Sequence, residues 1–233
     1  MNSSSRYAIY FVPAADRPLF RFGRAVLGYD CYTGETVAHP LFDAITPPEW
    51  AALTREPSIY GFHATLKAPF RLPPSTGEAE LMQAFAGFTA SGLAAAIINP
   101  CIRTLGRYVV LMARRPCPAL DALAARCVSA FDRFRAPLTQ AERERRLSAG
   151  LSPAEIAYLD QWGYPFVFDA YRFHMTLAGP VAPERRDVVL ASMQEAFARL
   201  CGDTELIVDR VALLRQYNAQ SRFRVLAQAP LGG

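Results

Sequence analysis

Two copies of a His-x-Thr motif hold the residues best suited to chemistry. The first copy contains His63 and Thr65, and the second contains His174 and Thr176. Their neighbours recur as well, as Tyr60, Phe62, Leu66 and Pro69 in the first copy and Tyr171, Phe173, Leu177 and Pro180 in the second. Because the chain has only three histidines, two of them in matched contexts indicate an internal duplication with a function.

Both motifs lie in short apolar segments that are typical of β-strands. Side chains alternate between the two faces of a strand, so His63 and Thr65 are expected to share a face, with Lys67 two residues further on. The same alternation places Arg172, His174 and Thr176 together. Each copy is therefore expected to present an imidazole, a hydroxyl and a cation.

Two imidazoles facing each other across a cleft suit proton transfer in a phosphoester reaction. A neutral histidine can accept a proton from the attacking water, while a protonated one donates to the departing oxygen. Threonine hydroxyls can bind the phosphate oxygens, and Lys67 and Arg172 could balance the negative charge. The sequence does not distinguish whether His63 or His174 is the base.

Other types of site find little support in the residues. A single His-x-Thr would more often be a core histidine in a strand, and Lys67 and Arg172 could equally be charges at strand ends. The motif strands supply no further metal ligands, and the chain lacks the nucleophile elbow and the phosphate-binding loop of other enzyme classes. We therefore expect no metal and no cofactor.

The same order of elements follows each motif: a helix and then two strands. The first lobe is predicted over about residues 60–114 and the second over about 171–229, within one bilobal domain that spans 1–233. Helix starts are predicted at Thr46, at Ser75-x-x-Glu78 and at Ser152-x-x-Glu155, which match capping patterns. A twofold relationship between the lobes would bring the motif strands together.

A connector over about residues 135–165 separates the predicted lobes. It contains the charged segment Glu142 to Arg146, and it could form a lid over the cleft or a plain surface linker. An aromatic group at its end could stack on a base or pack as part of a core or lid. Its members are Trp162, Tyr164, Phe166, Phe168 and Tyr171.

The amino-acid composition indicates where the protein is expected to be found and which kinds of ligand its charge permits. The 233 residues are 52% hydrophobic and 20% charged, which supplies a core, and the apolar run that ends at Pro13 is too short for a leader or a membrane span. The five scattered cysteines match no zinc or disulfide pattern. We expect a cytoplasmic protein, and its net charge of +4 permits a small phosphorylated substrate but argues against duplex DNA.

The paired motifs resemble those of the 2H phosphoesterase superfamily, which is defined by two His-x-Thr/Ser motifs. Longer strings resemble a branch of unknown function associated with phosphonate-utilisation genes. These strings are Arg6 to Phe11, Tyr60 to Phe70, Trp162 to Pro165 and Phe173 to Leu177.

The resemblance implies an α+β, bilobal fold with two pseudo-symmetric lobes of antiparallel sheet, helices outside and a central cleft. It further implies metal-independent hydrolysis of a cyclic or strained phosphodiester, with His63 and His174 as acid and base and with Thr65 and Thr176 as phosphate ligands. Gene association suggests a sugar cyclic phosphate. Two alternatives stay open: a protein that binds a nucleotide or phosphosugar without turnover, and an enzyme that processes or ligates RNA ends.

Overall fold

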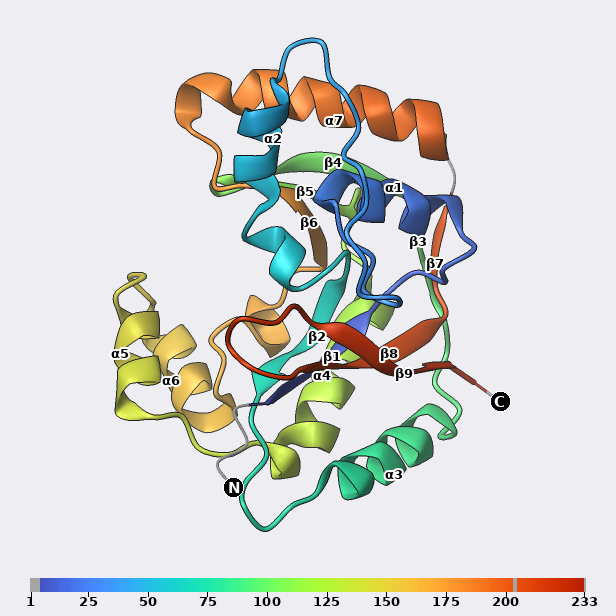
Figure 1. Cartoon of the computed structure of the whole chain (residues 1–233). Helices are drawn as coiled ribbons and strands as arrows, with labels where there is room; N and C mark the ends of the chain where they lie inside the picture. Colours follow the sequence, from blue (N-terminus) through green and yellow to red (C-terminus); the bar gives the residue numbers. More distant parts are fainter. Residues whose placement is uncertain (1–4, 203–204, 233) are drawn as a thin grey trace.

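The computed structural model describes residues 5–202 and 205–232, which form an α+β fold (Figure 1). The strands are β1 (Arg6–Phe11), β2 (Ala64–Phe70), β3 (Ala96–Ile98), β4 (Pro100–Leu105), β5 (Tyr108–Ala113), β6 (His174–Ala178), β7 (Leu206–Val208), β8 (Arg210–Gln216) and β9 (Arg224–Pro230). The α-helices are α1 (Pro18–Leu27), α2 (Pro47–Thr54), α3 (Glu78–Thr89), α4 (Pro118–Phe131), α5 (Gln140–Leu147), α6 (Pro153–Trp162) and α7 (Arg186–Cys201).

Seven of the described strands form one antiparallel sheet in the order β4-β5-β6-β2-β1-β8-β9, while β3 and β7 pair separately. The strands that carry the two motifs, β2 and β6, are neighbours at the middle of the sheet. The predicted α+β class with antiparallel pairing is therefore confirmed, and so is the meeting of the motif strands.

The strand order exchanges segments between the two repeats. Strands β4 and β5 follow β2 along the chain but extend the sheet beyond β6, whereas β8 and β9 follow β6 but extend it beyond β1. The ranges 60–114 and 171–229 therefore do not form separate sheets. Since β2 has β6 on one edge and β1 on the other, the strands that follow it can pair only elsewhere.

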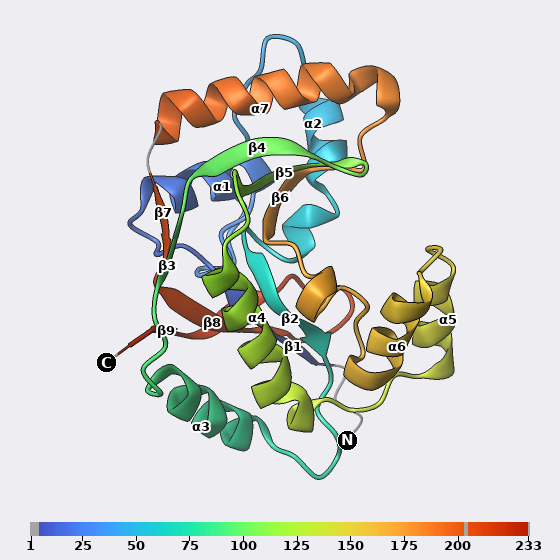
Figure 2. The same ribbon diagram turned by 180° about the vertical axis from the view of Figure 1, so that it is seen from behind.

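Helices cover the sheet on the face opposite the motif side chains. Helix α7 runs along β4, and α4 crosses β2 (Figure 2). Ala64 and Met175 point toward this helical layer and are fully buried, as are Ile9 and Leu111 from the adjacent strands. This alternation between a core face and a polar face is what sets the motif side chains on one side.

Helix starts follow their capping residues at most of the predicted places. Thr46 caps α2, and Ser152 and Glu155 form a capping box at the start of α6. The expected cap at Ser75 is wrong, because α3 begins after Gly77. Glu78 instead accepts a hydrogen bond from Tyr7 and pairs with Arg215, so its carboxylate is engaged elsewhere.

The connector forms two short helices, α5 and α6, that stand beside the sheet (Figures 1 and 2). A second capping box, made by Thr139 and Glu142, starts α5. Within the described ranges, none of the helices has the length and apolar character that crossing a membrane requires.

Candidate active site

The two motif strands, β2 and β6, form an antiparallel pair, so the two motifs run in opposite directions. Ala64 lies opposite Met175, so His63 neighbours Thr176 and Thr65 neighbours His174. All four side chains project from the face opposite the buried Ala64 and Met175. The pairing of β2 with β6 thus places one histidine and one threonine of each repeat next to those of the other.

All four motif side chains line a cavity of about 600 Å³. Further polar and aromatic side chains complete its wall: Arg6, Tyr10, Glu56, Tyr60, Tyr108, Arg145, Arg146 and Tyr164. A cavity of this size matches a small organic ligand rather than a macromolecular surface.

Both histidine rings are oriented by the same backbone contact. Nδ1 of His63 lies 2.8 Å from the carbonyl oxygen of Gly61, and Nδ1 of His174 lies 2.8 Å from that of Arg172, in each case two residues earlier. Because a carbonyl oxygen only accepts, Nδ1 carries the proton in both rings. Each Nε2 therefore faces away from the backbone and is the nitrogen that can exchange protons with a ligand.

His63 is held in its neutral form. Its pKa is lowered to about 4, chiefly by burial and to a smaller extent by the nearby charge of His174, while the hydrogen bond to Gly61 acts in the opposite direction. Its Nε2 lies 3.2 Å from the Thr65 hydroxyl. At neutral pH this nitrogen is an unprotonated acceptor, as a general base must be.

Lys67 does not share the face of His63, which corrects the prediction from strand alternation. Thr65 pairs with Tyr10 and Lys67 pairs with Ile9, so β2 contains a bulge of one residue at Leu66. A bulge reverses the alternation beyond it. Lys67 therefore points to the core face with Ile9, and its side chain is 4% exposed.

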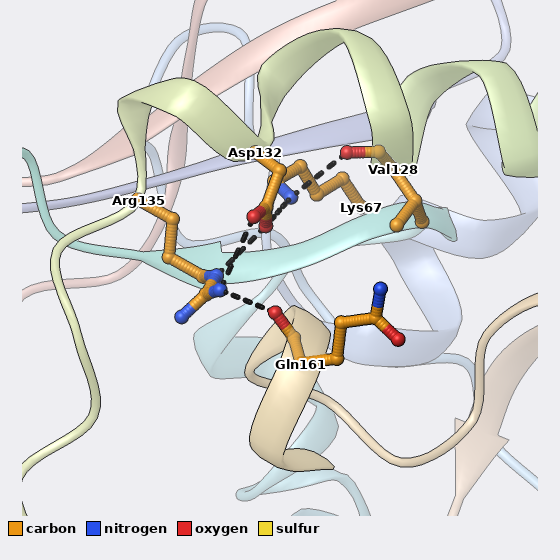
Figure 3. A network of polar contacts seen from close by, with 5 residues as sticks. All are labelled: Lys67, Val128, Asp132, Arg135 and Gln161. Atoms are coloured by element: carbon orange, nitrogen blue, oxygen red, sulfur yellow. Dashed lines mark hydrogen bonds and ion pairs between the residues drawn. The ribbon is translucent and has the colours of Figure 1, made fainter. Parts of the chain in front are cut away.

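The Lys67 ammonium is bound on that face by a network that joins three elements (Figure 3). It donates to the carbonyl oxygen of Val128 at 3.1 Å and to Asp132 at 3.0 Å. Arg135 also binds Asp132 and donates to the carbonyl oxygen of Gln161 at 2.9 Å. The network ties the end of α6 to α4 and β2, so Lys67 holds structure together instead of facing the cavity.

Arg172 lies near the motif, but its guanidinium bonds to its own loop. Its Nη1 donates to the carbonyl oxygens of Asp169 and Tyr171, at 2.8 and 2.6 Å. The side chain is exposed and lines a neighbouring hollow of about 1090 Å³, which shares Thr65 and His174 with the smaller cavity. A phosphate-binding role for Arg172 stays a prediction.

The structure adds cavity residues that the motif analysis did not identify. Arg145 and Arg146 come from α5, and Tyr164 follows α6, so the connector contributes to the wall of the cavity. Tyr10 comes from β1, and its ring stacks on His63 with 3.9 Å between centroids. The charged segment of the connector was the one sequence feature that pointed to Arg145 and Arg146. The alternating pattern of β1 indicated only a strand, and it did not indicate that Tyr10 would line the cavity.

In the described part of the chain, no three side chains among His, Cys, Asp and Glu gather as a group able to hold a metal ion. The cavity instead combines proton-exchanging imidazoles, hydroxyl donors and guanidinium groups. These groups can bind an anion and move protons to and from its oxygens.

Comparison with solved structures finds similarities at low sequence identity. E. coli LigT, in a crystal structure with 3'-AMP, covers 99% of both chains at 15% identity and a TM-score of 0.44. Usb1 from Kluyveromyces marxianus covers 98% of this chain and 99% of its own at 7% identity and a TM-score of 0.39.

Two curated proteins match over the whole length or nearly so. Ribose 1,5-bisphosphate phosphokinase PhnN of Janthinobacterium sp. (strain Marseille) is 34% identical over 235 residues, covering 100% of this chain and 52% of that protein. The protein of the same name in Laribacter hongkongensis (strain HLHK9) is 31% identical over 222 residues, covering 94% and 50%. The chain thus spans about half the length of these curated relatives.

A family model gives the clearest assignment. It is described as "Protein of unknown function (DUF1045)", and it matches residues 65–224, well over half of the chain. The matched range extends from Thr65 through the connector and the second motif to the start of β9. The chain therefore belongs to the DUF1045 family.

Proposed function

We propose that this protein is a metal-independent phosphoesterase that opens a cyclic or strained phosphodiester. The supporting observation is the pair of histidines on one cavity, each with Nδ1 bonded to a carbonyl oxygen and Nε2 left to exchange protons. Two such nitrogens on either side of a phosphorus atom are what in-line displacement needs.

In the proposed reaction His63 is the base and His174 is the acid. Nε2 of His63 takes a proton from water, and the water oxygen forms a bond to phosphorus. The bond from phosphorus to one ring oxygen breaks, and the protonated Nε2 of His174 gives its proton to that oxygen. The product is a phosphomonoester with a free hydroxyl. The low pKa of His63 favours this assignment over the reverse, since it keeps that ring unprotonated.

Thr65 and Thr176 are proposed to donate hydrogen bonds to the non-bridging phosphate oxygens. Each threonine neighbours the histidine of the other repeat, so one phosphate between the imidazoles would be within reach of both hydroxyls. Such donors stabilise charge that develops on the phosphate in the transition state. Arg172 is a further candidate ligand at the edge of this site.

The proposed substrate is a sugar or nucleotide cyclic phosphate. The curated relatives are named for ribose 1,5-bisphosphate, a ribose with two phosphate groups, and this supports a phosphorylated ribose as the substrate of our chain. A role in phosphonate metabolism is proposed on the same ground and on the resemblance of the motif strings.

Phosphorus NMR of the purified protein with a panel of cyclic phosphates tests this proposal. We expect ring-opened phosphomonoester signals that persist in EDTA. His63→Gln and His174→Gln should each reduce the rate about 100-fold or more. His39→Gln is the matched control, because His39 bonds to the carbonyl oxygen of Val26 and does not line the cavity.

Each other outcome has a distinct meaning. Binding without turnover would replace the enzyme with a phosphosugar-binding protein. Turnover that only oligonucleotides support, with steep salt dependence, would indicate an RNA-end enzyme. Loss of turnover in EDTA would refute metal independence.

A further inference from the structure

The cavity carries more positive charge than one phosphodiester requires. Arg6, Arg145 and Arg146 line it, and Glu56 is the one carboxylate among its lining residues in the described part of the chain. A cyclic phosphodiester has a single negative charge, and the proposed reaction assigns it to the motif hydroxyls and imidazoles. The arginines are therefore left to bind a second anionic group.

Two buried polar atoms at this cavity have no hydrogen-bond partner within the described residues. They are Nε of Arg146 and the phenol oxygen of Tyr10. Buried donors are nearly always satisfied, because leaving one unpaired costs free energy. Two unsatisfied donors on the wall of the same cavity are explained when a ligand supplies their acceptors.

The position of Arg146 is fixed by its neighbours. Its guanidinium lies 5.1 Å from the centre of the Tyr164 ring, a contact that uses the face of the guanidinium and not its N–H groups, and its Nε has no hydrogen-bond partner within the described residues. On the same helix, Arg143 pairs with Asp160 at 2.6 Å and Glu142 pairs with Arg71 at 2.7 Å. These ion pairs hold α5 against α6 and the end of β2, so Arg146 is presented to the cavity.

Protonation favours the same use of both residues. Burial raises the pKa of Tyr10 well above its ordinary value, so the phenol keeps its proton and can donate. Burial lowers the pKa of Arg146, and a guanidinium remains charged under all ordinary conditions. A partly buried cation that forms no ion pair with a carboxylate of the described residues is stabilised by an anion that enters beside it.

We propose that Arg146 and Tyr10 form a second anion subsite that binds a phosphomonoester on the same substrate molecule, with Arg6 and Arg145 adding positive charge around it. The substrate class is then a small sugar or nucleoside cyclic phosphate with a separate phosphate group. This inference rests on the proposed function, because the motif residues are taken to hold the cyclic diester. The planar guanidinium can bind two phosphate oxygens at once, and the phenol can donate to a third.

The test compares substrates that differ only by the second phosphate. One pair is adenosine 2',3'-cyclic phosphate with and without a 5'-phosphate, and the other is ribose 2,3-cyclic phosphate with and without a 5-phosphate. We expect kcat/KM to be on the order of 100-fold higher for the phosphorylated member of at least one pair. A ratio near one for both pairs would overturn the inference and leave the proposed function standing.

Variants separate a binding role from a structural one. Arg146→Ala should lower the ratio about 10- to 100-fold, and Tyr10→Phe should lower it less, since it removes a single neutral donor. Arg199→Ala removes the same charge from an exposed position on α7, outside the cavity and away from the ion pairs of α5, and should leave the ratio unchanged. If Arg146→Ala reduces kcat/KM equally for both members of a pair, its role is structural and the subsite is refuted.

Failure of the proposed function gives a different result. If no member of either pair is turned over, dissociation constants measured by calorimetry replace kcat/KM. A preference for the phosphorylated member that Arg146→Ala removes would then support the subsite in a binding protein. Equal affinities would refute it.

Discussion

The imidazole of His63 stacks on the ring of Tyr10, with 3.9 Å between ring centroids and 27° between ring planes. Tyr10 is fully buried in β1, next to Thr65 in the pairing of β1 with β2. The stack closes one side of the imidazole to water. This contact is therefore a direct cause of the burial that lowers the pKa of His63 to about 4.

Opening this stack should raise the pKa of His63. In Tyr10→Ala, water reaches the ring, and we expect the pKa to rise by at least about one unit toward the ordinary value of about 6.5. In Tyr10→Phe the ring remains, so the pKa should stay near 4. NMR titration of the imidazole protons measures it, with His63→Gln to assign the signal. A wild-type value near 6.5 would contradict the prediction.

The rate should depend on pH in the way that a base with a low pKa requires. As pH falls through about 4, His63 gains a proton and can no longer accept one, so kcat/KM for a cyclic phosphate should decrease there. Measurement of kcat/KM from pH 3.5 to 8 locates this limb. An acid limb centred near pH 6.5 would show that the base is a different group.

The free energy of unfolding should also decrease as the pH is lowered, because of His63. Between pH 6.5 and about 4 the unfolded chain binds a proton that the folded protein excludes, so the free energy of unfolding decreases as pH decreases. The slope from one such group reaches about 1.4 kcal/mol per pH unit. Urea denaturation at several pH values should show this contribution in the wild type and in His39→Gln. His63→Gln should lose it, and equal slopes in all three proteins would disprove it.

The network around Lys67 should matter for stability more than for substrate binding. Asp132→Ala leaves the buried ammonium without its carboxylate, and we expect it to lower the free energy of unfolding by about 3 kcal/mol. Lys67→Met removes the charge at similar volume and should lower the free energy of unfolding by less than about 1.5 kcal/mol. Denaturant titration measures both. Lys67→Met should also change KM by less than about threefold. A rise of tenfold or more would return Lys67 to the substrate site.

A side chain at Gly61 should lower the free energy of unfolding more than one at a comparable glycine. Its φ is +75°, and an added Cβ would lie 2.7 Å from Cβ of Cys31, while its carbonyl oxygen holds His63. Gly92 has a similar φ of +70° with no atom near its added Cβ, so it is the matched control. We expect Gly92→Ala to lower the free energy of unfolding by about 1–2 kcal/mol. Gly61→Ala should lower it by about 1–3 kcal/mol more than Gly92→Ala does. Equal losses in thermal or urea unfolding would show that the crowding at Gly61 is relieved without cost.

The sequence predicted the centre of the candidate site because local rules decide it. Thr65, His174 and Thr176 lie in regular strands and His63 directly precedes β2, so alternation assigns the face of all four. Lys67 lies past the bulge in β2, and nothing in the sequence of that strand marks a bulge. The face of Lys67 is set by pairing with β1, which is not a local property.

The connector residues could not be placed from the sequence for a similar reason. Capping patterns predict the start of α6, but the approach of α5 to the cavity depends on its ion pairs with Arg71 and Asp160. Arg71 is far from Arg146 in the sequence, and Asp160 belongs to α6. Patterns within one element carry no information about such contacts.

The exchange of strands between the repeats limits how the molecule can be divided. The first motif strand has its sheet completed by segments that follow the second motif, and the reverse holds for the second. A polypeptide with one repeat alone would leave an open edge at its motif strand, and a twin copy could fill that edge by symmetric assembly. The two histidines of one site would then come from two different chains. Fusion of the two genes would make that assembly permanent.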